Sequence, residues 1–362
     1  MKAILMLEDQ KTFEGKCLAG ITGERIGEVM FNTTIVGYQE ILTTAANAEK
    51  IIVFTYPLIG NYGVNDKFNE SEKVWAQAAV LKEPSRIYSN WQATGSFEDF
   101  VKKHNLLVLT GVDTRALTVH LRQKGQMLGI ISTTRFNTKE LLAVLEDFRK
   151  RQPVSKIAQI SIANPKTVGK LSKNKKRIAL IDIGLTRSLL AQLEECDLAI
   201  SILPYSANSQ QIVKTKPQGL IISDGPEQDL GLRLVEQNIK PLIGKLPIFG
   251  IGTGMQVVAS CLGAKVFKMH CGHHGVNYPI HRPGSYKGQI TMQNHSWVVD
   301  ADSLARRKDI KVTAYNLNDH TVEEIESKKL KILGIQYVPA RPGFNEINPA
   351  ILRFVKMMER RK

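Results

Sequence analysis

Four short, uninterrupted apolar runs in the second half of the chain constrain its fold most strongly. They are RIALIDIG (177–184), GLIISDG (219–225), LPIFGIG (246–252) and KILGIQYV (331–338), with helical patterns between them. Strands that are apolar along their whole length are buried on both faces, which is typical of a parallel sheet with helices on either side. We therefore predict a doubly wound α/β domain over residues 177–362. Asn348 and Pro349 suit the cap and the first position of its last helix.

The first half of the chain has a different pattern. Residues 1–150 alternate β-branched runs at 3–7, 27–37 and 50–60 with Gly-containing turns, and they predict an α+β domain. The stretch 106–125 predicts a strand, a turn and a helix that begins after Asp113 and ends at Gly125, and a further helix is expected around 138–150. Residues 151–176 contain Pro153, Pro165 and a lysine cluster, which predicts a linker between the two domains.

Composition limits the classes of function. Hydrophobic residues make up 43% of the 362-residue chain, which excludes a disordered protein, and no apolar run approaches the roughly 18 residues of a membrane span. The apolar run at the start is too short for a secretory signal, so we expect a cytoplasmic protein with no membrane partner. Its widely spaced cysteines should be reduced; they are Cys17, Cys196, Cys261 and Cys271.

The chain is strongly basic. Lysine and arginine number 49 against 34 acidic residues, a formal net charge of +15. The basic residues are spread along the chain, with the densest runs at 173–177 and 360–362, and no zinc-finger or RNP motif accompanies them. This distribution favours a solvated basic surface, or a surface for an acidic protein partner, over nucleic acid.

The most informative segment for chemistry is IFGIGTGMQVVASCLGAK, at 248–265. A buried strand runs into Gly252-Thr253-Gly254 and a helix follows, which is the arrangement of a nucleophile elbow. The apex of such an elbow carries the nucleophile, and the next backbone N–H faces a developing oxyanion at the positive end of the helix. Here the apex is Gly252, which has no side chain that could attack a substrate.

Over nearly its whole length the sequence resembles the small subunit of carbamoyl phosphate synthetase (synthase), the glutamine amidotransferase partner. The resemblance rests on residues 31–43, 54–65 and 109–125 in the first half, and on 223–226, 250–256, 267–279, 293–300 and 334–339 in the second. It implies a small-subunit N-terminal domain over 1–150 and a glutamine amidotransferase-like domain over 177–362. It also implies a large-subunit partner, which would hold ATP and metal, and no cofactor on this chain.

The residues that carry the family's chemistry are replaced. By the resemblance, the cysteine nucleophile falls on Gly252, the histidine base on Val338 and the glutamate that orients the base on Ala340. Acyl transfer from glutamine needs a thiolate activated by a base, so we expect no intact catalytic residue. The glutamine pocket has also changed, although Gly225, Gln256 and Asn294 remain. Its positions are occupied by Ala46, Gly225, Glu227, Thr253, Gln256, Asn294, Ser296 and Trp297.

Other side chains are poorly placed to replace the missing nucleophile and base. Cys261 lies nine positions along the helix from Gly252, and the hydroxyl of Thr253 has no histidine at position 338. His295 lies nearby in the family's arrangement, but its sequence context there is structural. A histidine-rich segment invites a metal-site interpretation, but its spacing is not that of a zinc finger or zincin, and we expect a structural loop and no metal. This segment contains His270, Cys271, His273, His274 and His281.

Three hypotheses follow. In the first, the chain has lost glutamine hydrolysis and supports or regulates a large subunit that makes carbamoyl phosphate from bicarbonate, ammonia and ATP for pyrimidine or arginine biosynthesis. In the second, the chain is a conventional subunit that hydrolyses glutamine and delivers ammonia. In the third, it is a repurposed binding or regulatory protein without enzymatic activity. The missing side chains at Gly252, Val338 and Ala340 favour the first.

Overall fold

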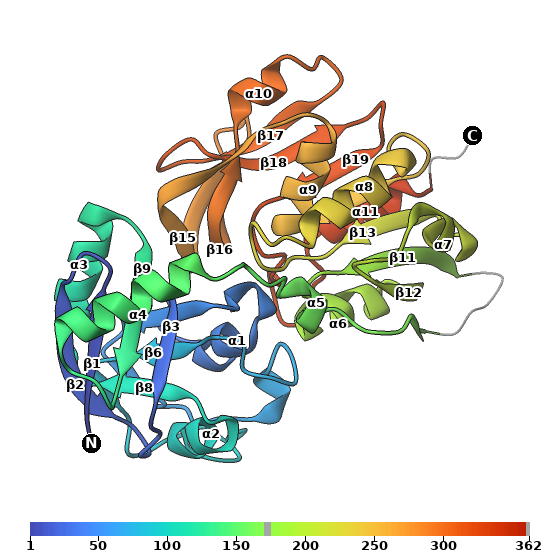
Figure 1. Cartoon of the computed structure of the whole chain (residues 1–362). Coiled ribbons are helices and arrows are strands. Elements are labelled where there is room, and N and C mark those ends of the chain that lie inside the picture. The colour runs from blue at the N-terminus through green and yellow to red at the C-terminus, as the bar shows by residue number, and fades with distance from the viewer. Residues whose placement is uncertain (170–174, 360–362) are drawn as a thin grey trace. The chain divides into compact units, whose positions relative to one another are not determined.

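The computed structural model describes residues 1–169 and 175–359, and the chain divides into two compact units (Figure 1). The first contains residues 1–153 and 270–275, and the second contains 154–269 and 276–362. Residues 173–174 of one basic run and all of the run at 360–362 lie outside the described residues. Within the described ranges, no helix is long and apolar enough to cross a membrane.

A closed β-barrel forms the centre of the first unit. Its strand order is β1 (Lys2–Leu7), β2 (Thr12–Cys17), β8 (Leu107–Thr110), β6 (Ala78–Val80), β4 (Lys50–Phe54), β3 (Glu24–Asn32) and β9 (Met127–Ser132). The remaining elements are α1 (Tyr38–Thr43), η1 (Ala45–Asn47), β5 (Leu58–Ile59), η2 (Asp66–Phe68), β7 (Glu83–Pro84), α2 (Phe97–His104), α3 (Thr114–Lys124) and α4 (Thr138–Lys150). The sequence predicted β1, β3, β4, β8, α3 and α4, but it predicted neither β2, β6, β9, α1 and α2 nor that the strands close on themselves.

Alternate barrel residues pack against different helices, as the period of two in a strand requires. Leu5 belongs to one buried cluster with residues of α3, whereas Ile4 and Met6 pack with Leu141 of α4. Helix α3 follows its predicted cap, because the carboxylate of Asp113 accepts the N–H of Ala116 at 2.9 Å.

The strand predicted over 27–37 is too long. Strand β3 ends at Asn32, whose side-chain oxygen accepts the backbone N–H of Thr34 at 2.9 Å and so turns the chain. The strand predicted over 50–60 likewise ends at Phe54 and resumes only as the short β5. A β-branched run shows where strands are favoured, but it does not show where they end.

The second unit is built on one ten-stranded sheet. Its order is β10 (Lys166–Val168), β12 (Leu198–Pro204), β11 (Lys176–Asp182), β13 (Gly219–Ile222), β14 (Ile248–Ile251), β19 (Ile332–Ile335), β18 (Val322–Ser327), β17 (Lys311–Asn316), β15 (Val266–His281) and β16 (Gly288–Val299). The run from β12 to β19 is parallel, as its apolar pattern predicts. Strands β10, β18 and β17 pair antiparallel.

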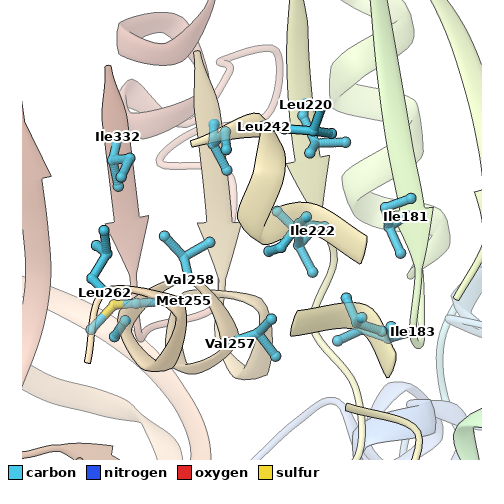
Figure 2. Close-up of a cluster of buried hydrophobic side chains, with 14 of the residues drawn as sticks. Ile181, Ile183, Leu220, Ile222, Leu242, Met255, Val257, Val258, Leu262 and Ile332 are labelled. Carbon is cyan, nitrogen blue, oxygen red and sulfur yellow. The ribbon is translucent and has the colours of Figure 1, made fainter. Parts of the chain in front are cut away.

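Helices cover both faces of the parallel strands. On one face, Ile181 of β11 and Ile222 of β13 belong to the same buried cluster as Met255 and Val257 of α9 (Thr253–Cys261), which Figure 2 shows. On the other face, Leu180 packs with residues of α6 (Arg187–Glu195) and α11 (Pro349–Met357). The remaining elements are α5 (Ile157–Ile160), α7 (Ser209–Lys214), α8 (Leu232–Ile239), η3 (Lys240–Leu242) and α10 (Ala301–Ala305).

The stretch predicted as a linker, 151–176, is largely part of the second unit. Ile157 of α5 is fully buried in the core, and the carboxylate of Asp229 accepts the N–H of Lys156 at 2.6 Å. Strand β10 extends the sheet beside β12. The segment contributes only one core side chain and a short edge strand, so its composition does not reveal that it is folded.

Candidate functional site

The elbow predicted from the sequence is present at the carboxyl end of β14. Strand β14 ends at Ile251, Gly252 adopts φ 54° and ψ −118°, and α9 begins at Thr253. The N–H of Gly252 donates to the carbonyl oxygen of Ile335 at 2.8 Å, which holds the turn against the end of the neighbouring strand β19. Any side chain at position 252 would be strained at this positive φ, as is usual for the apex of such an elbow.

The space above this apex is occupied by a carboxylate. A Cβ built on Gly252 would lie 2.2 Å from Oδ1 of Asp224, far inside contact distance. The same oxygen accepts the backbone N–H of Thr253 at 2.9 Å. That N–H is the one that follows the apex and would face a developing oxyanion in an active elbow. In this chain it is bound by an acidic side chain instead.

Sequence reasoning did not select Asp224, although it lies within the quoted segment 223–226. Its position directly after strand β13 was the available signal, because parallel strands place their carboxyl ends along one edge of a sheet. Thr253 is further fixed by its hydroxyl, which donates to the carbonyl oxygen of Gly225 at 2.7 Å. Gly225 itself has no room for a side chain, since a Cβ there would lie 2.0 Å from the carbonyl oxygen of Ile183.

A second carboxylate lies among the predicted pocket residues. Glu227 accepts the backbone N–H of Ser296 at 2.9 and 3.1 Å and that of Trp297 at 2.9 Å. The side-chain amide of Gln256 lies 3.2 Å from the same carboxylate and donates to the carbonyl oxygen of Trp297 at 2.9 Å. The structure thus brings four predicted pocket positions together. Three of them, Gln256, Ser296 and Trp297, direct an N–H group at the carboxylate of the fourth, Glu227.

The positions expected for the base and its orienting acid lie just beyond β19. Val338 is half-buried and donates its backbone N–H to the carbonyl oxygen of Met292 at 2.9 Å, whereas Ala340 is exposed. The carbonyl oxygen of Ala340 accepts the side-chain amide of Asn348 at 2.8 Å. The backbone of this segment is well held, but neither side chain can accept a proton.

Comparison with known proteins identifies the family. The model of the carbamoyl-phosphate synthase small chain, CPSase domain, matches residues 5–131, and that of the class-I glutamine amidotransferases matches residues 179–340. A carbamoyl phosphate synthase small chain from Akkermansia muciniphila is 35% identical, covering 99% of this chain and 98% of its own. One from Listeria monocytogenes is 36% identical over 99% and 97%, and one from Aquifex aeolicus is 36% identical over 99% of each.

The chain belongs to the carbamoyl phosphate synthase small chain family. It is a small subunit with a glutamine amidotransferase domain, as its resemblance predicted. Two further pocket positions can be located within this small chain. Asn294 lies half-buried in β16, and Ala46 is buried in η1 of the first unit.

Within this small chain, the alternative nucleophile Cys261 is poorly suited to catalysis. It ends α9, where burial, with the charge of Glu236 adding to it, raises the pKa of its thiol to about 12. Its sulfur lies 3.5 Å from the carbonyl oxygen of Glu236. Because only the thiolate attacks, a thiol with this pKa is almost entirely unreactive at neutral pH.

Two histidines of this small chain, His270 and His295, have hydrogen-bond partners of their own. His295 is buried, with Nε2 at 2.8 Å from the side-chain oxygen of Gln293 and Nδ1 at 3.2 Å from the carbonyl oxygen of Trp297. In the segment that invited a metal-site interpretation, Nε2 of His270 lies 3.2 Å from the carbonyl oxygen of Arg122.

Proposed function

We propose that this small chain of carbamoyl phosphate synthase does not hydrolyse glutamine and that it supports or regulates a large subunit that uses free ammonia. The complex would make carbamoyl phosphate from bicarbonate, ammonia and ATP, in the cytoplasm, for pyrimidine or arginine biosynthesis. The observation that carries the proposal is the Asp224 carboxylate, which lies where a nucleophile's Cβ would be and binds the N–H of Thr253.

The first support is the absence of the reacting groups. Hydrolysis through an acyl-enzyme needs a nucleophile with an adjacent base, and removal of one member of such a set costs about 10⁴ to 10⁶ in rate. Here Gly252 offers no nucleophile and Val338 offers no base. Cys261 is held as a thiol by its burial.

The second support is electrostatic. An oxyanion is stabilised by donors aimed at the developing negative charge, and such a donor is worth roughly 3–4 kcal/mol. The N–H of Thr253 is already bound by Asp224, and Glu227 binds the N–H groups of Ser296 and Trp297. Both carboxylates would repel a developing oxyanion, so the altered pocket opposes the reaction as well as lacking its reactants.

The third support concerns the partner. The half of the chain matched by the small-chain model, residues 5–131, is separate in sequence from the degenerate amidotransferase site. Its barrel is well packed, with alternate strand residues committed to buried clusters. A first unit that still matches the small-chain model is expected if binding to the large subunit remained useful after glutamine hydrolysis was lost.

The test is reconstitution of the complex with the cognate large subunit. We expect synthesis of carbamoyl phosphate with ammonium chloride as the nitrogen source and none above background with glutamine. Glutamine-dependent synthesis at a rate comparable to that with ammonia would overturn the proposal. A chain that does not co-purify with the large subunit, but binds another protein, would support the hypothesis of a repurposed regulatory protein instead.

The conventional function, glutamine hydrolysis with delivery of ammonia, is the second candidate. It is favoured by the full-length similarity to relatives that carry the small-chain name, at 34–36% identity. Incubation of the purified complex with glutamine distinguishes the two candidates. Release of glutamate, or a γ-glutamyl adduct on this chain in mass spectrometry, would establish the conventional function, whereas neither is expected under our proposal.

A further inference from the structure

A hollow of about 590 Å³ lies in the second unit, away from the elbow in sequence. Three segments form it: the loop after α10, the start of β17, and the turn after β18. Its volume is within the range of roughly 300–1,000 Å³ that is usual for small-molecule sites. The hollow is lined by Lys308, Asp309, Lys311, Thr313, Glu326, Lys328 and Lys329.

The charge of this hollow is strongly positive, because its carboxylates are already paired. Asp309 forms two hydrogen bonds with Arg307, at 2.8 and 3.0 Å, and its pKa lies below its ordinary value chiefly for this reason. Glu326 forms an ion pair with Arg353 at 2.9 Å. The two acidic charges of the lining are thus compensated by arginines that do not line it, and the lysine charges remain.

The lysines of the lining are exposed and available. The structure places no carboxylate within ion-pair distance of their ammonium groups in the described ranges 1–169 and 175–359. Four ammonium groups around one hollow repel one another unless an anion lies between them. These are Lys308, Lys311, Lys328 and Lys329.

The wall beneath the lysines is rigid. The fully buried carboxylate of Glu324 accepts a two-pronged bond from Arg282, at 2.8 and 2.9 Å, and a bond from Arg353 at 2.7 Å. It also accepts the hydroxyl of Thr313, a lining residue, at 2.7 Å. Arg353 binds both Glu324 and Glu326 and so joins α11 to β18, while Thr313 joins β17 to the same carboxylate, so this wall is held in place before any ligand arrives.

We propose that this hollow binds a small, multiply charged phosphate compound of about the size of a nucleoside triphosphate. Ammonium groups are compact point charges that suit phosphate oxygens, and a cation would be repelled. No lining residue is aromatic, so the hollow lacks the stacking surface with which proteins hold single-stranded nucleic acid. The proposal does not depend on glutamine hydrolysis, because the hollow and the elbow share no residue.

The test uses inorganic triphosphate as the probe, titrated into the full chain by calorimetry at low salt. The double variant Lys311→Glu/Lys329→Glu reverses two lining charges. Its matched control, Lys214→Glu/Lys245→Glu, reverses two exposed lysines of the same unit that do not line the hollow. Both variants have the same net charge, so diffuse attraction to a basic protein would weaken equally in the two.

We expect the lining variant to bind triphosphate at least tenfold more weakly than the parent chain, and the control to stay within twofold. Equal weakening in both variants, or no binding by the parent at millimolar triphosphate, would overturn the proposal. A single-stranded oligonucleotide that binds in place of triphosphate, with the same sensitivity to the lining variant, would overturn it in favour of nucleic acid. Lys328→Gln/Lys329→Gln provides a milder second variant if charge reversal prevents folding, and circular dichroism monitors folding.

Discussion

At the scale of single residues, the altered elbow is defined by what surrounds Gly252 as much as by the missing side chain. The carboxylate of Asp224 both fills the space of a Cβ and binds the N–H of Thr253. By the resemblance, the sequence alone places the family's nucleophile on Gly252 and its base on Val338. It did not predict the role of Asp224, because the contact joins residues 29 positions apart and the position of Asp224 after a buried strand indicates only that it lies at the same sheet edge.

The substitution Gly252→Cys should therefore destabilise the chain without creating activity. A Cβ at 2.2 Å from Asp224 and a non-glycine residue at φ 54° should together cost about 1–3 kcal/mol of unfolding free energy, measured by urea denaturation. The matched variant Gly252→Cys/Asp224→Gly removes the clash and should recover part of this cost. Full stability of Gly252→Cys on its own would contradict the contact described here.

Glu227 should be worth more to folding than an ordinary surface carboxylate. Glu227→Ala leaves the N–H groups of Ser296 and Trp297 without their acceptor, and an unsatisfied buried donor costs about 1–3 kcal/mol. Glu227→Gln keeps one acceptor oxygen and should cost less. Thermal unfolding of the two variants compares them, and a Glu227→Ala variant as stable as the parent would show that these bonds contribute nothing.

At the scale of elements, the apolar runs predicted β11, β13, β14 and β19 because strands in the middle of a parallel sheet bury both faces. The antiparallel part of the sheet could not be predicted in the same way. Strand β18 buries Glu323 and Glu324 completely, so its sequence, VEEIES, is that of a surface segment. A buried carboxylate is stable only with partners from other elements, and for Glu324 these are Arg282 and Arg353.

The Glu324 network predicts a specific dependence of stability on pH. Burial alone would raise the pKa of Glu324, but the bonds from Arg282 and Thr313 and the charge of Arg353 lower it below its ordinary value of 4.5. A lowered folded-state pKa gives stability that is complete above the unfolded value and is lost as the pH falls through the folded value. Stability of the second unit should therefore decline below about pH 4.5.

The variant Glu324→Gln tests the same network. It leaves two arginines partly unpaired and should cost about 3–5 kcal/mol at pH 7. Because it removes the titrating group, it should also flatten the acid limb of a plot of unfolding free energy against pH. An unchanged acid limb would mean that other carboxylates control the loss of stability.

At the scale of the whole molecule, the chain combines a unit built on a closed barrel with a glutamine amidotransferase unit built on a ten-stranded sheet. The sequence predicted two halves of different character because that prediction depends on long segments, whereas the location of the glutamine site stays a prediction. Closure of the barrel and the folding of residues 154–168 into the second unit were not predicted, because pairing between distant strands leaves no local pattern.

Glutamine should not stabilise the whole chain. A ligand that binds only the folded state raises the unfolding temperature, by an amount equivalent to about 2.7 kcal/mol at one hundred times its dissociation constant. With Glu227 and Asp224 on the pocket's donors, we expect no shift in the thermal midpoint with 10 mM glutamine, roughly a saturating level for a micromolar site. A clear rise would show that the pocket still recognises its former substrate, whether or not it reacts.

The position of Asp224 has a consequence for the history of this chain. A cysteine at position 252 would clash with the acid, so an unstrained elbow requires that the acid be replaced first, and that replacement brings no benefit by itself. A base at 338 would likewise be useless until the sulfur is present. Under the proposed function, natural selection would find no advantage in any of the first steps back, and the order in which the changes would have to occur would hold the lineage on the ammonia-dependent side.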